Sequence, residues 1–284
     1  MASTHDPRSL ASETSAAVES LMRPSHELAL AEAAITASCM RRKGLDYPVA
    51  EAIAKLPAPQ PPRLAGLGTP IDPETAYRAG YGPQINPAPG SDPVENAEAA
   101  YFEALSPTER RAYHRELSGG SDEVVVSMPS GARIGASSTG CAADARRTLY
   151  GSIEAFLQVT YCRNEFPRVA DTTMTSRTVR ATLHAYGQSM RAAGYRFRTP
   201  QLALKAAEQR WGGTRPAAGP ISLEERDQAF ADAAAQAVSR CNQAMDEVAL
   251  ANALHWIRSN ERWLLDLAAV QAHALDVAAE LTCS

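Results

Sequence analysis

The chain has 284 residues and a formal net charge of −4 at pH 7, and 45% of its residues are hydrophobic and 21% charged. Its length allows one large domain or two modest ones, with a sizeable buried core. The slightly acidic balance lacks the basic footprint that binding to a polyanion usually leaves. We therefore expect no nucleic-acid partner.

The sequence also bears on membranes and export. No apolar run approaches the roughly 20 residues that a helix needs to cross a bilayer, so no membrane-spanning segment is expected. Residues 1–26 lack the apolar stretch of a signal peptide. The chain as given is therefore expected in the cytoplasm, or in an extracytoplasmic compartment if Met1 replaces an export signal.

The N-terminal region predicts an arm followed by helices. Residues 1–25 are rich in Ser, Thr and Ala and are expected to form a flexible arm. Ser25 is a plausible N-cap, and apolar residues at helical spacing predict a helix over 26–43. Gly44 is expected to end this helix as a C′ residue. A short helix is predicted at 49–56.

A Pro-rich loop follows at residues 57–92, which contain nine prolines and at most one helical turn at 73–79. Loops of this length are uncommon in compact domains and often functional. We expect either a plain wrapping loop or a lid or binding loop. Tyr77 and Tyr81 lie within it and are candidate ligand-binding residues.

The next segments predict helices around one small sheet. Asp-Pro and Ser-Pro pairs begin predicted helices at 93–104 and 107–117. Residues 123–134 combine a β-branched run with a Pro-Ser-Gly turn and predict a β-hairpin. A long helix is predicted from about 140 to 165, with its apolar residues on one face.

The rest of the chain is expected to be helical. Helices are predicted at 173–193 and 200–211, and a helical stretch runs from Ser222 almost to Cys283. A break in this stretch is expected at 242–247 or at 259–260. The predicted fold is mainly α: a helical bundle of two related units, 26–170 with the inserted hairpin and 171–284 with long C-terminal helices.

A short motif that occurs twice supports the two related units. Residues 39–48 and 189–200 share Met-Arg-x-x-Gly, and in each an aromatic residue follows three positions after the Gly, with a Pro shortly beyond. This pattern predicts one helix end used twice, and hence an internal repeat. The first copy begins with Cys39, whereas the second begins with Ser189.

The order of these elements resembles a group of uncharacterised actinobacterial exported proteins and lipoproteins, over about residues 27–245. The matching pieces are Cys39-Met40-Arg41, Gly44, Tyr47-Pro48, Tyr81-Gly82, Leu105-Ser106-Pro107, the Val-rich hairpin, Gly140-Cys141, Ala145-Arg146, Leu149-Tyr150-Gly151, Met190-Arg191, Gly194 and Cys241-Asn242. The resemblance implies export and paired cysteines, and it supplies no catalytic residues. This chain departs from the pattern at Ser189 and in having no signal segment.

Five cysteines leave two interpretations open. If the protein is exported, Cys39 and Cys141 are the first candidates for a disulfide, which would close a loop of roughly 100 residues and stabilise the fold by about 4–5 kcal/mol. If it is cytosolic, both are expected to be buried thiols. No CxxC or Cys/His pair has zinc spacing, so no metal site is expected.

Four further residues are candidates for ligand binding. Arg41 and Arg191 each fall in the last turn of a predicted helix, where a cation complements exposed carbonyls or faces an anionic ligand. His184 is an ordinary histidine or an acid–base group. Trp256 shares a helical face with Trp263, which predicts a helix–helix seam or a binding stripe.

No nucleophile, metal or phosphate motif was found, and no cofactor is expected. This favours a non-catalytic helical binding or interaction protein of unknown ligand. The alternative is a cytosolic enzyme or accessory protein of specialised (natural-product) metabolism, with a site in the cleft between the two helical units. An exposed apolar patch would favour the first, and a pocket with convergent polar groups and perturbed pKa values the second.

Overall fold

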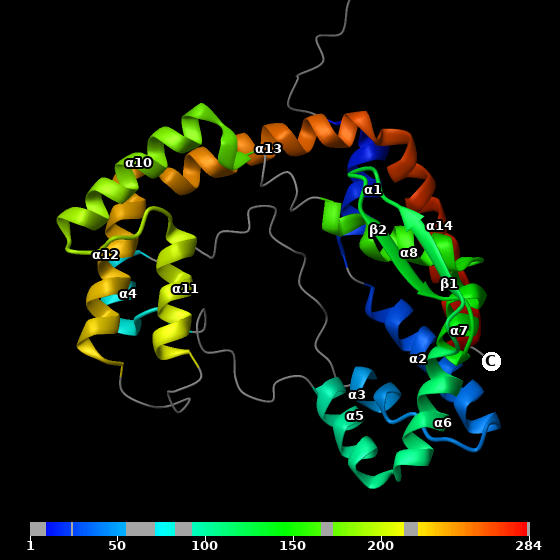
Figure 1. Ribbon diagram of the computed structural model, residues 1–284. Coiled ribbons are helices and arrows are strands. Elements are labelled where there is room, and N and C mark those ends of the chain that lie inside the picture. The colour runs from blue at the N-terminus through cyan, green and yellow to red at the C-terminus, as the bar shows by residue number, and fades with distance from the viewer. Residues whose placement is uncertain are drawn as a thin grey trace, which may run out of the picture. The chain divides into compact units, whose positions relative to one another are not determined.

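The structure is a computed structural model that describes residues 10–23, 25–54, 72–82, 93–165, 173–212 and 221–282. The fold is mainly α with a small inserted β-hairpin, as the sequence predicted (Figure 1). The chain divides into two compact units: unit 1 comprises residues 1–62, 92–166 and 254–284, and unit 2 comprises residues 63–91 and 167–253.

Unit 1 contains helices from both ends of the chain around one hairpin. Its elements are α1 (Ser12–Met22), α2 (His26–Arg42), α3 (Val49–Ala54), α5 (Pro93–Ala104), α6 (Pro107–Ser118), β1 (Glu123–Ser127), β2 (Arg133–Ser137), α7 (Cys141–Tyr150), α8 (Ile153–Tyr161), η2 (Cys162–Glu165) and α14 (Glu261–Thr282). Helix α14 packs on α1, α2, α7 and α8. Leu149, Leu157 and Leu264 are fully buried where these helices meet.

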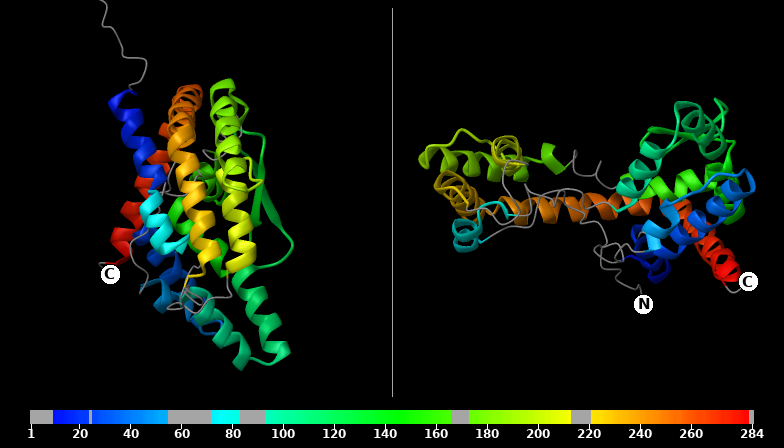
Figure 2. Two further views of the ribbon diagram at one scale, coloured as in Figure 1. Left: turned by 90° about the vertical axis from the view of Figure 1, so that its left-hand side faces the viewer. Right: turned by 90° about the horizontal axis from the view of Figure 1, so that it is seen from below.

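Unit 2 is a smaller set of helices packed around α12 (Figure 2). Its elements are α4 (Pro73–Ala79), α10 (Arg177–Ala192), α11 (Pro200–Trp211), α12 (Leu223–Ser239) and the first part of α13 (Cys241–Ser259), which passes into unit 1 after residue 253. Helix α12 contacts α4, α10 and α11. Arg240, between α12 and α13, has a left-handed backbone (φ 51°).

The hairpin is antiparallel, with Val124 opposite Ala136 and Val126 opposite Ile134. Its strands pack on α8, which a lone hairpin needs for stability. The buried Glu165 holds the turn of the hairpin in place. Its carboxylate accepts hydrogen bonds from the Ser130 backbone N–H (2.8 Å) and hydroxyl (2.7 Å).

The two Met-Arg-x-x-Gly segments end helices in the same way. In both, the Gly has positive φ, 74° at Gly44 and 87° at Gly194, as predicted for a C′ residue. Each carries the two hydrogen bonds of a Schellman ending. These bonds join Leu45 N to Met40 O (3.0 Å), Gly44 N to Arg41 O (3.0 Å), Tyr195 N to Met190 O (2.8 Å) and Gly194 N to Arg191 O (3.0 Å).

Two sequence-based expectations differ from the structure near the N-terminus and in the middle of the chain. Residues 12–22 of the expected flexible arm form α1, because Ala17 and Leu21 pack their side chains against α14. The single helix expected over 140–165 is broken. Gly151 has φ 78° and ends α7, and the Ser152 hydroxyl then caps α8 by accepting from Ala155 N (3.0 Å).

The C-terminal region also differs from the predicted division. The break expected at 259–260 is present between α13 and α14, and a second break lies at Arg240, just before the predicted 242–247. Helix α14, expected in the second unit by chain order, belongs to unit 1 because it packs on α1 and α7. Of the Pro-rich loop, residues 72–82 are described and include the expected helical turn as α4; the remainder lies outside the described residues.

Candidate functional site

A cluster of buried polar side chains lies in unit 2, on the inner face of α12. Four polar residues of this helix are spaced so that all point to one side: Glu225, Gln228, Asp232 and Gln236. The first three are at most 4% exposed. Polar groups are costly to bury unless they are hydrogen-bonded, so their partners define what this cluster can do.

Asp232 is the centre of the cluster. Its carboxylate accepts hydrogen bonds from the Tyr186 hydroxyl (2.8 Å), the Tyr81 hydroxyl (3.1 Å) and the Gln236 side-chain amide (2.7 Å). Tyr186 comes from α10, and Tyr81 follows α4. One carboxylate therefore joins three elements of unit 2 through groups that are buried from water.

A second layer of hydrogen bonds surrounds this centre. The Gln228 amide donates to the Tyr81 hydroxyl (3.2 Å) and to the Ala203 carbonyl of α11 (3.1 Å). The Asn242 amide of α13 donates to the side-chain carbonyl of Gln236 (2.6 Å). The cluster thus connects α12 to α10, α11 and α13 and to Tyr81, just after α4.

Burial shifts the acid–base behaviour of the cluster. It raises the pKa of Asp232 above the ordinary value, and the hydrogen bonds from Gln236, Tyr186 and Tyr81 oppose this by stabilising the carboxylate. The pKa values of Tyr81 and Tyr186 are raised, first by burial and then by the neighbouring Asp232 charge. Both phenols therefore stay protonated and keep donating to the carboxylate.

Gly80 lets the chain approach Glu225 closely. Its φ is +56°, and a Cβ at this position would lie 2.4 Å from Oε1 of Glu225. The same carboxylate oxygen accepts the Tyr81 backbone N–H at 3.2 Å. A residue without a side chain is therefore needed where the chain enters the cluster.

We predict that Gly80→Ala lowers the free energy of unfolding of unit 2 by roughly 2–4 kcal/mol, through backbone strain and displacement of Glu225. Gly82→Ala is the matched control, because Gly82 also has positive φ (53°) but open space around it, so that it should cost only about 1–2 kcal/mol. Urea unfolding followed by circular dichroism compares the two variants. Equal costs would contradict a steric role for Gly80.

The outer face of α12, opposite the cluster, is apolar and open to solvent. Exposed fractions are 68% at Leu223, 45% at Phe230 and 77% at Val238. Ala237 is also exposed, Ala234 is half-buried, and Asp227 is the charged residue among them. Tyr77 of α4 is 48% exposed and its ring lies 6.0 Å from that of Phe230. We call Leu223, Phe230, Ala234, Ala237 and Val238 the outer face.

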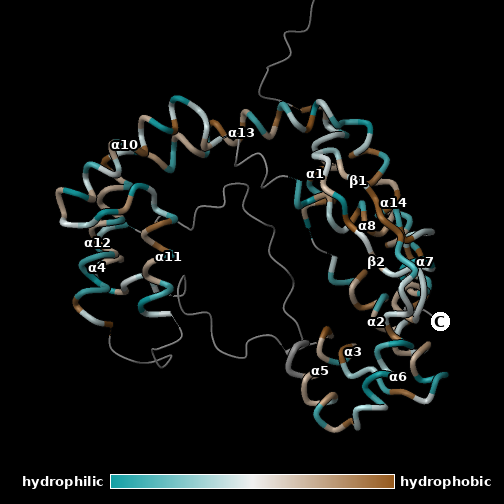
Figure 3. The backbone as a smooth tube through the Cα atoms, in the orientation of Figure 1, coloured by the Kyte–Doolittle hydropathy of each residue, from teal (hydrophilic) through white to brown (hydrophobic). Residues whose placement is uncertain are grey.

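Helix α12 therefore has the reverse of the usual arrangement, with polar residues inside and large apolar residues outside. Figure 3 shows hydrophilic and hydrophobic residues alternating along the helices of unit 2. A surface helix of a globular protein normally buries its apolar stripe. The hydrogen bonds of Asp232 fix the rotation of α12 about its axis, and this keeps Phe230 at the surface.

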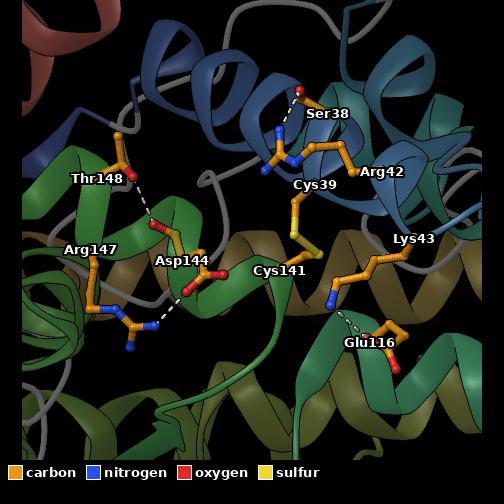
Figure 4. Close-up of a disulfide and its surroundings, with 9 residues drawn as sticks. All are labelled: Ser38, Cys39, Arg42, Lys43, Glu116, Cys141, Asp144, Arg147 and Thr148. Carbon is orange, nitrogen blue, oxygen red and sulfur yellow. Dashed lines mark hydrogen bonds and ion pairs between the residues drawn. A yellow bond between two sulfur atoms is a disulfide. The ribbon is translucent and has the colours of Figure 1, made fainter.

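Cys39 and Cys141 form a disulfide in unit 1, with Cα atoms 5.6 Å apart (Figure 4). Both cysteines are buried. Lys43, just after α2, pairs with Glu116 of α6 at 3.4 Å nearby. The bridge joins the end of α2 to the start of α7, and its two cysteines are those the sequence singled out as candidates.

Two other cysteines, Cys162 and Cys241, are buried free thiols. Burial raises the pKa of Cys162 to about 12 and also raises that of Cys241. Cys283 lies outside the described residues. Neither buried thiol has the lowered pKa of a reactive cysteine.

The residues that the sequence proposed for ligand binding are dispersed. Tyr81 is buried in the Asp232 cluster, and Tyr77 lies beside the outer face. Three others lie on solvent-exposed helix surfaces: Arg191 and His184 on α10, and Arg41 at the end of α2. Trp256 is half-buried against Trp263 in unit 1, with ring centroids 6.2 Å apart.

Asp232 and Tyr186 are members of the site that the sequence did not predict. A usable signal was present, since four polar residues of 225–236 recur at helical spacing on one side of the predicted helix. The same pattern places apolar residues on the opposite side. Hydrophobicity alone then predicts the wrong face as buried, because it does not include the tyrosine partners from distant segments.

Within the described residues, no three His, Cys, Asp or Glu side chains are arranged to hold a metal ion. None of the described helices has the length and apolar character needed to cross a bilayer. No protein family, curated protein or solved structure matches this chain.

Proposed function

We propose that the chain is a non-catalytic binding protein and that the outer face of α12 is its partner surface. The observation that supports this is the reversed polarity of α12. Full burial of a Phe or Leu side chain stabilises a fold by about 1.5–3 kcal/mol. Phe230 and Leu223 lack much of this stabilisation because they are exposed to solvent. A contiguous exposed apolar surface is typical of protein interaction sites.

The Asp232 cluster has a supporting role in this proposal. Rotation of α12 would bury Phe230 but would break the bonds from Tyr81 and Tyr186 to the carboxylate. The cluster therefore holds α12 in the rotation about its axis that leaves the outer face exposed to solvent. A pre-positioned surface lowers the ordering cost of binding.

Site-specific crosslinking tests the proposal. Phe230 is replaced by the photoreactive p-benzoylphenylalanine in the cells that naturally produce the chain, and Gln188, exposed on α10, is replaced in the same way as the control. We expect a discrete crosslinked product from position 230 that is lost on adding Val238→Glu. No product at 230, or the same products at both positions, would contradict the proposal.

One observation favours the alternative of an enzyme or accessory protein of specialised metabolism. A buried carboxyl with a raised pKa, here Asp232, is typical of acid–base sites. Its side chain is 3% exposed, so a substrate would need an opening of unit 2. Val238→Glu separates the two functions: it would abolish crosslinking at position 230 and would leave catalysis at the buried Asp232 carboxyl intact, because Val238 is exposed on the opposite side of α12.

We also propose that the two helix-end motifs belong to duplicated units. Cys241 begins α13 as Cys141 begins α7, and Cys241 shares a buried cluster with Met190. Met40 shares the equivalent cluster with Cys141. We predict that Ser189→Cys forms a disulfide with Cys241 under oxidising conditions, which mass spectrometry of a non-reducing digest would detect. Pairing with Cys162, or a free introduced thiol, would contradict the duplication.

The disulfide also supports a proposal on cellular environment. Structural disulfides persist in oxidising compartments, which agrees with the resemblance to exported actinobacterial proteins. We propose that the chain folds in such a compartment. Alkylation of intact cells before lysis checks this, since Cys39 and Cys141 should resist the reagent until a reductant is added.

A further inference from the structure

We propose that the outer face of α12 binds the same face of a second copy of this chain, with the two α12 helices antiparallel about a two-fold axis near Phe230. This inference rests on the proposed function and names its partner. A contact of this kind is isologous, so each residue of the face meets the residue related to it by reversal of the helix.

The spacing of the large apolar residues is nearly symmetric under that reversal. Leu223 and Val238 lie seven and eight residues from Phe230. Antiparallel pairing centred on Phe230 therefore places Leu223 of each copy against Val238 of the other and brings the two Phe230 rings together. The small residues Ala234 and Ala237 let the two helices approach closely. From Leu223 to Val238 the face is about 22 Å long.

The charges at the two ends of α12 favour the antiparallel direction. Near its N-terminal end Asp227 is exposed and Glu224 pairs with Arg210 of α11 (2.5 Å), and Arg240 is exposed just beyond its C-terminal end. Reversal brings Arg240 of one copy towards Asp227 of the other, whereas a parallel pair would bring the two Asp227 carboxylates together. The helix dipoles also favour the antiparallel direction, because it places the positive end of one helix beside the negative end of the other. The face thus complements itself in both shape and charge.

The outer face is small for a stable protein–protein interface. One helix pair of this length buries less than the 1,200–2,000 Å² or so of a standard stable interface. We therefore expect a reversible dimer with a dissociation constant on the order of tens of micromolar. Sedimentation equilibrium of the full chain over about 1 µM to 1 mM measures it.

Phe230 offers a sharp test because a residue on a two-fold axis meets its own copy. Phe230→Glu and Phe230→Lys should each be monomeric, since like charges would face each other and weaken association by more than about tenfold. An equimolar mixture of the two variants should associate again as a heterodimer. Val125→Glu is the control, because Val125 is similarly exposed (42%) but lies on the hairpin of unit 1; this variant should dimerise like the wild type.

Several outcomes would overturn the proposal. The proposal is wrong if the wild-type chain stays monomeric over the whole concentration range. It is also wrong if Phe230→Glu and Val238→Glu still dimerise, or if the mixture of the two charged variants stays monomeric. Circular dichroism confirms that the variants fold. The mass of the product crosslinked at position 230 distinguishes the dimer from the proposed function. A product of twice the chain mass supports a second copy, whereas a product of another mass contradicts the dimer but not the proposed function. The absence of any product contradicts both.

Discussion

Replacing both Cys39 and Cys141 by Ser is expected to lower the free energy of unfolding of unit 1 by about 4–5 kcal/mol, which is a large part of the stability of an ordinary domain. The bridge joins residues 102 apart in sequence, so it removes much conformational freedom from the unfolded chain. Urea unfolding of the two forms, followed by circular dichroism, measures the loss directly.

A reductant supplies the control for this prediction. Dithiothreitol should destabilise the wild-type chain by the same amount and have no effect on the double Ser variant, because Cys162 and Cys241 are free thiols. Trypsin should then cut unit 1 of the reduced protein much faster. An unchanged unfolding midpoint after complete reduction would show that packing alone holds α2 against α7.

Asp232→Ala is expected to destabilise unit 2 by roughly 2–5 kcal/mol at neutral pH. The change removes the acceptor for Tyr81, Tyr186 and Gln236, and each buried donor left without a partner costs about 1–3 kcal/mol, less the recovered cost of burying a charge. Hydrogen exchange of the α12 amides locates the effect. Exchange that is faster in unit 1 instead would contradict the role of Asp232 as the centre of unit 2.

The pH dependence of the Asp232 contribution follows from the direction of its pKa shift. Because burial raises the pKa in the folded state, the folded protein binds this proton more tightly than the unfolded chain does. The resulting stabilisation is fully present below the ordinary value of 3.8 and is lost as the pH rises through the raised pKa. Asp232→Asn cannot titrate, so its stability relative to the wild type should rise across that interval.

Much of the secondary structure could be predicted because local signals decide it. Serine N-caps mark the starts of α2, α6 and α12, and Pro107 also occupies the first position of α6. Gly44 and Gly194 mark helix ends through their positive φ. These signals act within a few residues, so a single sequence carries them completely.

The site could be predicted much less well because it depends on contacts between distant segments. Tyr81 was singled out from its loop, yet its partner Asp232 lies 151 residues later. The local pattern of α12 groups its polar residues on one side but does not indicate that this side is buried. Likewise, Ala17 and Leu21 gain their partners from α14, at the other end of the chain, so α1 was mistaken for an arm.

The interleaving of the two units has a consequence for the order in which the chain can fold during synthesis. Unit 2 takes α4 from residues 73–79 but cannot enclose it until α12 has been made, and unit 1 lacks α14 until residues 261–282 have been made. Unit 2 is complete only after residue 253 has been made, and unit 1 only after α14, whereas the Cys39–Cys141 bridge joins partners that are available much earlier. The apolar side chains of the early segments therefore stay exposed until their later partners have been synthesised. During that time the nascent chain can aggregate or bind chaperones. A premature stop that removes only α14 would consequently damage the unit that contains the N-terminus.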